Sequence, residues 1–85
     1  MEKGEWYKAF GETETPSGET ECYYHLLDIG ESVRVRVYYY YPDLKHVKHL
    51  ESTTEEYPVK WWLKQLAENN IHLIPKSELP FLLKF

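Results

Sequence analysis

The most regular alternation of hydrophobic and polar positions in this chain lies between residues 32 and 41, in the segment SVRVRVYYYY. Successive side chains of an extended strand point to opposite faces, so a period of two divides these residues into two sets. One face carries Val33, Val35, Val37, Tyr39 and Tyr41. The other face carries Arg34, Arg36, Tyr38 and Tyr40. We predict a strand over 32–41 with one face against a core and one face of arginine and tyrosine, which are residue types enriched at binding surfaces.

The preceding segment, residues 19–29, is predicted to form the partner strand of a hairpin. Gly30 and Glu31 fit a two-residue type II′ loop, because the first central position of that loop favours glycine. This loop would pair Ile29 with Ser32, Leu27 with Arg34, His25 with Arg36, Tyr23 with Tyr38, Leu26 with Val35 and Tyr24 with Val37. Leu26, Tyr24 and Cys22 then share the valine face, and Tyr23 and His25 share the arginine–tyrosine face. A slip of one residue would exchange the two faces.

Weaker patterns predict further strands. Residues 5–14 are predicted as a first strand, followed by a turn at Thr15-Pro16-Ser17-Gly18, where proline presets φ and glycine tolerates a positive φ. Residues 45–51 follow a turn at 41–44 and are predicted as a strand, with a short helix capped by Asp43 as the alternative. A short strand is expected at 71–74.

A single amphipathic helix is predicted over residues 58–69. Pro58 suits the first turn, and Glu55 and Glu56 just before it complement the helix dipole. The apolar stripe consists of Val59, Trp62, Leu63 and Leu66, spaced as i, i+3, i+4 and i+7. Trp61 is expected opposite that stripe, among charged residues.

The C-terminal segment, residues 71–85, is too apolar to remain uncovered. It would lie either over the arginine–tyrosine face of the sheet or over Trp61, and whichever surface it leaves open is the better candidate for binding. Together these elements predict a single α+β domain over residues 1–85, an antiparallel β-meander of three to five strands with one amphipathic helix packed on one face.

Composition adds limits to this picture. Fourteen of the 85 residues are aromatic, which lets a chain of this size build a dense core. The single cysteine, Cys22, excludes an intramolecular disulfide and is typical of a reducing compartment. No signal-like N-terminus or membrane-spanning run is present, so we expect a cytoplasmic protein, of a cell or of an infected host. The net charge is −4, with −6 in residues 1–31 and +3 in residues 32–50.

Catalytic or metal chemistry has little support. His46 and His49 share a face only on a helix, and no further ligand lies at a suitable spacing. Cys22 and His25 are expected on opposite faces of one strand, which separates a nucleophile from its base. With no glycine-rich phosphate loop, we expect no enzyme activity, no cofactor and no metal.

The arginine–tyrosine face has three interpretations. It could be packing surface beneath the C-terminal segment, or a single-stranded nucleic-acid platform in which tyrosines stack bases and arginines hold phosphates. The acidic net charge favours the third, a protein interface. By size and composition we expect a small inhibitor or modulator of a larger protein, similar to those of phages, mobile elements and immunity systems. Self-association into a homodimer is a further alternative. The predicted contact residues are Arg34, Arg36, Tyr38, Tyr40 and Tyr23, with Trp61 as an alternative anchor.

Overall fold

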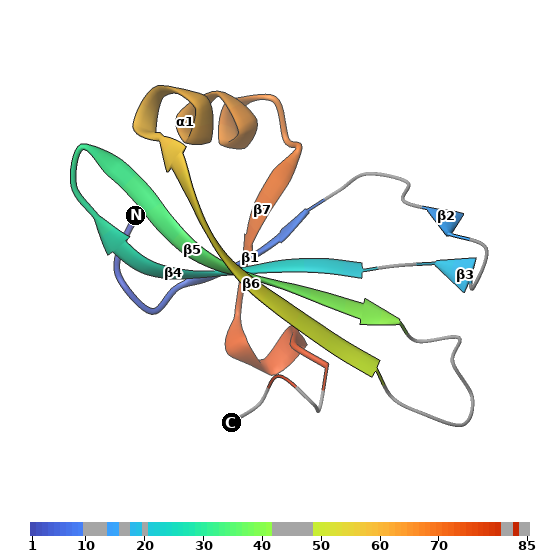
Figure 1. The fold of residues 1–85 in the computed structure, drawn as a ribbon. Coiled ribbons are helices and arrows are strands. Elements are labelled where there is room, and N and C mark those ends of the chain that lie inside the picture. Colours follow the sequence, from blue (N-terminus) through green and yellow to red (C-terminus); the bar gives the residue numbers. More distant parts are fainter. Residues whose placement is uncertain (10–13, 16–17, 20, 42–48, 81–82, 84–85) are drawn as a thin grey trace.

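The computed structural model describes residues 1–9, 14–15, 18–19, 21–41, 49–80 and 83 (Figure 1). A five-stranded antiparallel sheet has the order β6-β5-β4-β1-β7. Its strands are β1 (Trp6–Ala9), β4 (Glu21–Ile29), β5 (Ser32–Tyr41), β6 (His49–Pro58) and β7 (Ile71–Ile74). The helix α1 (Val59–Ala67) connects the two edge strands, and a 3-10 turn, η1 (Lys76–Glu78), follows β7. The two-residue strands β2 (Glu14–Thr15) and β3 (Gly18–Glu19) pair separately. The predicted α+β class and antiparallel meander are confirmed.

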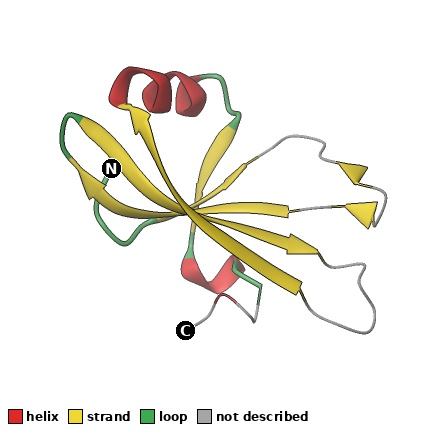
Figure 2. Cartoon of the chain, in the orientation of Figure 1, coloured by secondary structure: helices red, strands yellow, loops and turns green. Residues whose placement is uncertain are grey.

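The sheet is covered on both sides. The helix α1 lies on one side of the twisted sheet, and η1 lies on the other (Figures 1 and 2), where Leu79 and Leu83 pack in a second core. The chain therefore has three layers: the helix α1, the sheet, and the segment after β7. The sequence analysis left open which surface this last segment would cover. No helix in the described ranges is long and apolar enough to cross a membrane.

The core beneath α1 is built on the valine face of β5, as predicted. Trp62 of α1 is fully buried and meets the rings of Tyr7 and Tyr24 edge-on, with centroids 5.2 and 5.5 Å away. This cluster also contains Leu26, Val33, Val35, Val37 and Ile71. Because four strands and the helix each contribute to it, this cluster fixes α1 over the centre of the sheet.

A second core lies on the opposite face of the sheet. Its buried members are Trp6, Tyr23, Tyr38, Leu79 and Leu83. Leu79 and Leu83 come from the C-terminal segment, so that segment covers the tyrosines of the arginine–tyrosine face. The Tyr23 hydroxyl donates a hydrogen bond to Glu21 (2.8 Å), which satisfies its polar end.

The hairpin register is confirmed over its central pairs and is wrong near the loop. Tyr23 faces Tyr38 and Leu26 faces Val35, but a bulge at Leu27 places Asp28 opposite Arg34. Gly30 is not among the residues with positive φ, so the type II′ loop is also wrong. The bulge moves Ile29 to the valine face, opposite Val33, whereas the residues from Leu26 back to Cys22 keep their predicted faces.

The helix is rotated relative to the predicted stripe. Leu63 was expected in the core but is 49% exposed, while Trp61, expected opposite the stripe, is 39% exposed. At 100° per residue, these two side chains lie on either flank of Trp62. The helix therefore centres its buried face on Trp62.

Strand β6 is displaced from the predicted segment 45–51. It runs from His49 to Pro58, and residues 52–56 are exposed on both faces. An edge strand without a buried face has no apolar alternation to detect, which explains the difference. Positions 45–48, including His46, lie outside the described residues, as do residues 10–13 of the predicted first strand.

Candidate interaction surface

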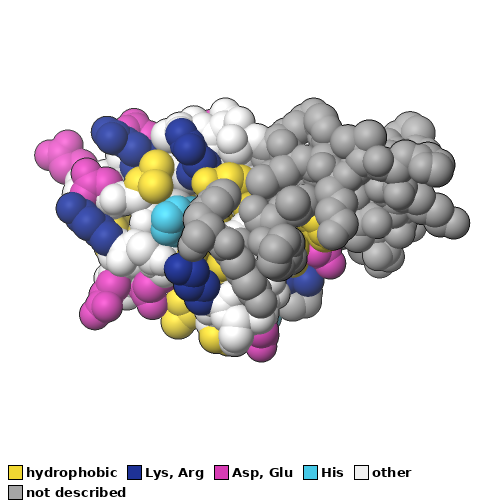
Figure 3. Space-filling model, turned by 90° about the horizontal axis from the view of Figure 1, so that it is seen from below, with side chains coloured by type: hydrophobic (Ala, Val, Ile, Leu, Met, Phe, Trp, Pro, Cys, Tyr) yellow, Lys and Arg dark blue, Asp and Glu magenta, His cyan; other side chains and the backbone are white. Residues whose placement is uncertain are grey.

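The part of the second sheet face that the C-terminal segment leaves open is rich in positive charge. Arg34 and Arg36 are exposed on β5, and His25 lies opposite Arg36 on β4. Lys76 of η1 is close enough for its charge to act on His25. Figure 3 shows this side of the molecule, with a histidine among Lys and Arg side chains. We call His25, Arg34, Arg36 and Lys76 the cationic cluster.

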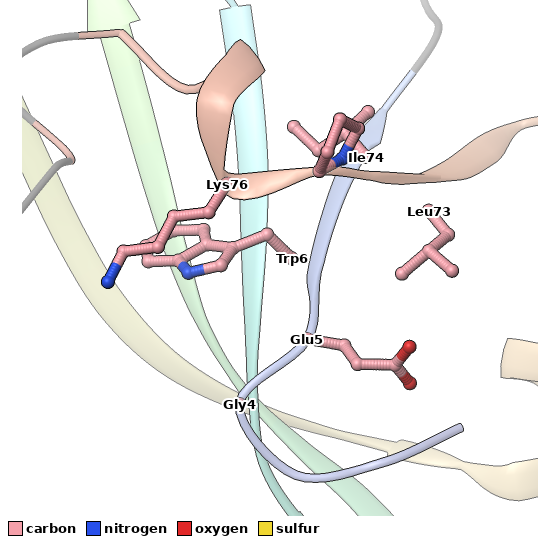
Figure 4. Close-up of a pocket in the computed structure, with 7 residues that line it drawn as sticks. Gly4, Glu5, Trp6, Leu73, Ile74 and Lys76 are labelled. Carbon is pink, nitrogen blue, oxygen red and sulfur yellow. The ribbon is translucent and has the colours of Figure 1, made fainter.

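Trp6 holds the centre of the cationic cluster in place. Its ring stacks on His25 with centroids 4.2 Å apart and an interplanar angle of 4°. The Trp6 ring also contacts the ring of Tyr38, with centroids 5.4 Å apart. The side chain of Lys76 extends across the indole of Trp6 (Figure 4). The imidazole is therefore fixed by packing before any ligand arrives.

The backbone around Gly4 completes this arrangement. Gly4 has a φ of +88°, in the left-handed region that favours glycine. Its N–H donates to the Leu26 carbonyl at 2.8 Å, which holds the N-terminal segment beside β4. The Gly4 backbone also forms a hydrogen bond with His25.

Burial lowers the pKa of His25 below its ordinary value of 6.5. The positive charges of Lys76 and Arg36 lower this pKa further, and the hydrogen bond to Gly4 opposes both effects. His25 is therefore mainly neutral at pH 7. An anion placed between these groups would reverse the repulsion and favour its protonation.

Ion pairs neutralise only part of the positive charge on this face. Arg34 Nε lies 3.2 Å from Glu56 Oε1, and Lys3 Nζ lies 3.1 Å from Asp28 Oδ1. No acidic residue in the described part of the chain pairs with Arg36 or Lys76. These two cations are the ones available to a partner.

The predicted contact residues are divided between different environments. Arg34 and Arg36 are exposed as expected. Tyr23 and Tyr38 are buried, at 3% and 6% exposure, and Tyr40 is half-buried against the second core. Trp61 lies on the α1 side of the sheet, away from the two arginines. The structure therefore does not present the predicted residues as one surface.

Sequence reasoning missed His25 and Lys76 as members of the site. The predicted register had already placed His25 beside Arg36, but His25 was not included among the predicted contact residues. Lys76 had no local signal, because its position depends on which face the C-terminal segment covers.

A shallow cavity of about 470 Å³ adjoins the cationic cluster at the β1–β7 edge (Figure 4). It is lined by Gly4, Glu5, Trp6, Leu73, Ile74, Pro75 and Lys76. The Glu5 carboxylate accepts a hydrogen bond from the Tyr7 hydroxyl (3.1 Å), so it is already engaged. The cavity provides an apolar floor beside Lys76, suited to a side chain of a docked segment.

The described residues assemble no catalytic constellation. Cys22 lies on the α1 side of β4, while His25 lies on the other side. Burial raises the pKa of the Cys22 thiol, which disfavours the reactive thiolate. No group of three potential metal ligands is found among the described side chains.

Comparison with known proteins gives no relative: no family model matches the chain, and neither a curated protein nor a solved structure matches it.

Proposed function

We propose that this chain is a non-catalytic protein-binding module that docks an acidic surface of a larger protein on its cationic cluster, and that it acts there as an inhibitor or modulator. The observation that carries the proposal is the pair Arg36 and Lys76, two cations without a described acidic partner in a chain of net charge −4. A positive patch on a chain that is negative overall orients an approaching partner and favours partners with an acidic surface.

Preorganisation supports this role. The planar guanidinium of Arg36 can bind a carboxylate through two parallel hydrogen bonds. The neighbouring His25 is held by its stack on Trp6, so docking would restrict little further motion there. The adjoining cavity would accept an apolar side chain next to the acidic group.

The burial of two tyrosines favours a protein partner over single-stranded nucleic acid. A sheet that binds single strands presents aromatic rings on which bases stack. Here Tyr23 and Tyr38 lie beneath Leu79 and Leu83. This face offers cations that could bind phosphates, but it has no exposed aromatic rings from Tyr23 or Tyr38 on which bases could stack.

An NMR titration with two probes tests the proposal. We expect an acidic octapeptide of alternating glutamate and leucine to shift backbone amides around His25, Arg36 and Lys76. The double variant Arg36→Glu, Lys76→Glu should weaken this binding at least about ten-fold, because it removes two charge-assisted contacts.

The control is Lys60→Glu, which makes one such charge reversal, half of the change in the double variant, on α1 on the other side of the sheet. It should leave peptide binding unchanged. A single-stranded dT oligonucleotide that binds more tightly than the peptide at 50 mM salt, with steep salt dependence, would contradict the proposal in favour of nucleic acid. Equal weakening by Lys60→Glu would also contradict it.

A further inference from the structure

Strand β6 has an outer edge with which no strand in the described part of the chain pairs. It ends the sheet order, and its other edge pairs with β5 in an uninterrupted register from Ser32–Pro58 to Tyr41–His49. Alternate backbone groups of an edge strand have no partner within the sheet, and they can pair with another chain. β6 is therefore an open template for strand addition.

Bulges, lysines and an internal proline, which often protect an edge strand, are missing from β6. Its register contains no bulge, its only proline is the last residue, Pro58, and its sequence HLESTTEEYP has no lysine. Serine and threonine occupy positions 52–54, and threonine favours extended structure. The strand is acidic, since it contains Glu51, Glu55 and Glu56 and no arginine or lysine.

The negative charge of β6 determines which kind of strand can pair with its outer edge. A second copy of β6 would bring the glutamates of both strands together, and like charges across a strand pair are destabilising. A basic extended segment would instead place its Lys or Arg side chains beside them. Of the glutamates with a described side chain, Glu56 already pairs with Arg34, whereas Glu55 forms no ion pair with a described residue.

An aromatic pair adjoins the same strand on the α1 side. Tyr57, near the end of β6, stacks on Trp61 with centroids 4.5 Å apart and an interplanar angle of 21°. Trp61 is 39% exposed, whereas Trp6 and Trp62 are buried. Register places Glu55 and Tyr57 on this same face, opposite Val35 and Val33. A cation over the face of an exposed tryptophan is attracted to it.

We propose that the outer edge of β6 accepts a basic extended segment of a partner protein as an additional strand, with Glu55 and Trp61 contacting its Lys or Arg side chains on the α1 side. Backbone pairing would supply affinity, and the alternating side chains of the segment would supply specificity. This site is separate from the cationic cluster and does not depend on the function proposed above.

Hydrogen exchange of β6 amides, followed by NMR, tests the inference. The probe is an octapeptide that alternates lysine with threonine. At saturating peptide, alternate amides of β6 should exchange at least about ten-fold more slowly, because they become hydrogen-bonded to the added strand. An octapeptide that alternates glutamate with threonine should produce no protection.

Variants of the chain locate the contact. Glu55→Lys should abolish protection, while Glu68→Lys, the same charge change at the far end of α1, should retain it. Trp61→Leu keeps apolar bulk and should weaken peptide binding roughly two- to five-fold through the lost cation–π contact. Arg36→Glu, Lys76→Glu should still bind the basic peptide, which separates this site from the cationic cluster.

Three results would overturn the inference: equal protection by the acidic peptide, unchanged binding by Glu55→Lys, or protection of β6 that rises with protein concentration in the absence of peptide. The last result would identify a second copy of the chain as the occupant.

Discussion

At the scale of single residues, His25 shows how packing determines charge. The ring is stacked on Trp6 and lies near Arg36 and Lys76, so its protonated form is disfavoured by burial and by like charge. In the unfolded chain its pKa would return to about 6.5. The folded protein therefore binds fewer protons than the unfolded chain just below that pH. The stability that His25 contributes is present above pH 6.5 and is lost as the pH falls.

An NMR titration of the His25 ring proton checks this placement. We expect a pKa below 6.5 in the native chain and a higher pKa in Lys76→Glu, because a repelling charge is replaced by an attracting one. Lys60→Glu should leave the His25 pKa unchanged. If Lys76→Glu has no more effect than Lys60→Glu, then η1 does not lie beside His25.

At the scale of elements, the C-terminal segment is a layer of the structure. Its side chains Leu79 and Leu83 are as buried as the valines under α1. They cover the half of the arginine–tyrosine face that contains Tyr23 and Tyr38. The segment thus decides which residues remain at the surface, and it brings Lys76 to the edge of the open part.

A matched pair of leucine substitutions tests the role of this segment. Leu83→Ala removes a fully buried side chain and should lower the free energy of unfolding by about 2–5 kcal/mol. Leu63→Ala makes the same change at a half-exposed position of α1 and should cost less than about 1 kcal/mol. Urea unfolding measures both. Equal costs would show that the C-terminal segment is not packed on the sheet.

At the scale of the whole molecule, the parts of the fold that depend on local sequence patterns were predicted better than the contacts between distant segments. The alternation of residues 32–41 and their hairpin with the preceding segment, residues 19–29, correctly separated the valine face from the arginine–tyrosine face. The bulge at Leu27 was missed because the predicted register was counted from a two-residue loop without an irregularity. Residues 52–58 of strand β6 were missed because polar residues on both faces of an edge strand leave no periodic signal.

The candidate site depends on contacts that sequence could not supply. The cationic cluster joins β4 and β5, which are local neighbours, to Trp6 of β1 and Lys76 of η1, which are not. No pattern along the chain indicated whether residues 71–85 would cover the tyrosines or Trp61. Once they cover the tyrosines, Trp61 remains exposed beside the outer edge of β6.

The central claim is that the cationic cluster binds an acidic partner protein. Its most direct test is quantitative affinity capture from the cells that contain the chain, with three baits compared side by side: the native chain, Arg36→Glu with Lys76→Glu, and Lys60→Glu. We predict one protein, with an acidic surface, that the native chain and Lys60→Glu retain equally and that the double variant loses. An identical set of captured proteins on all three folded baits, or capture that nuclease treatment abolishes, would contradict the claim.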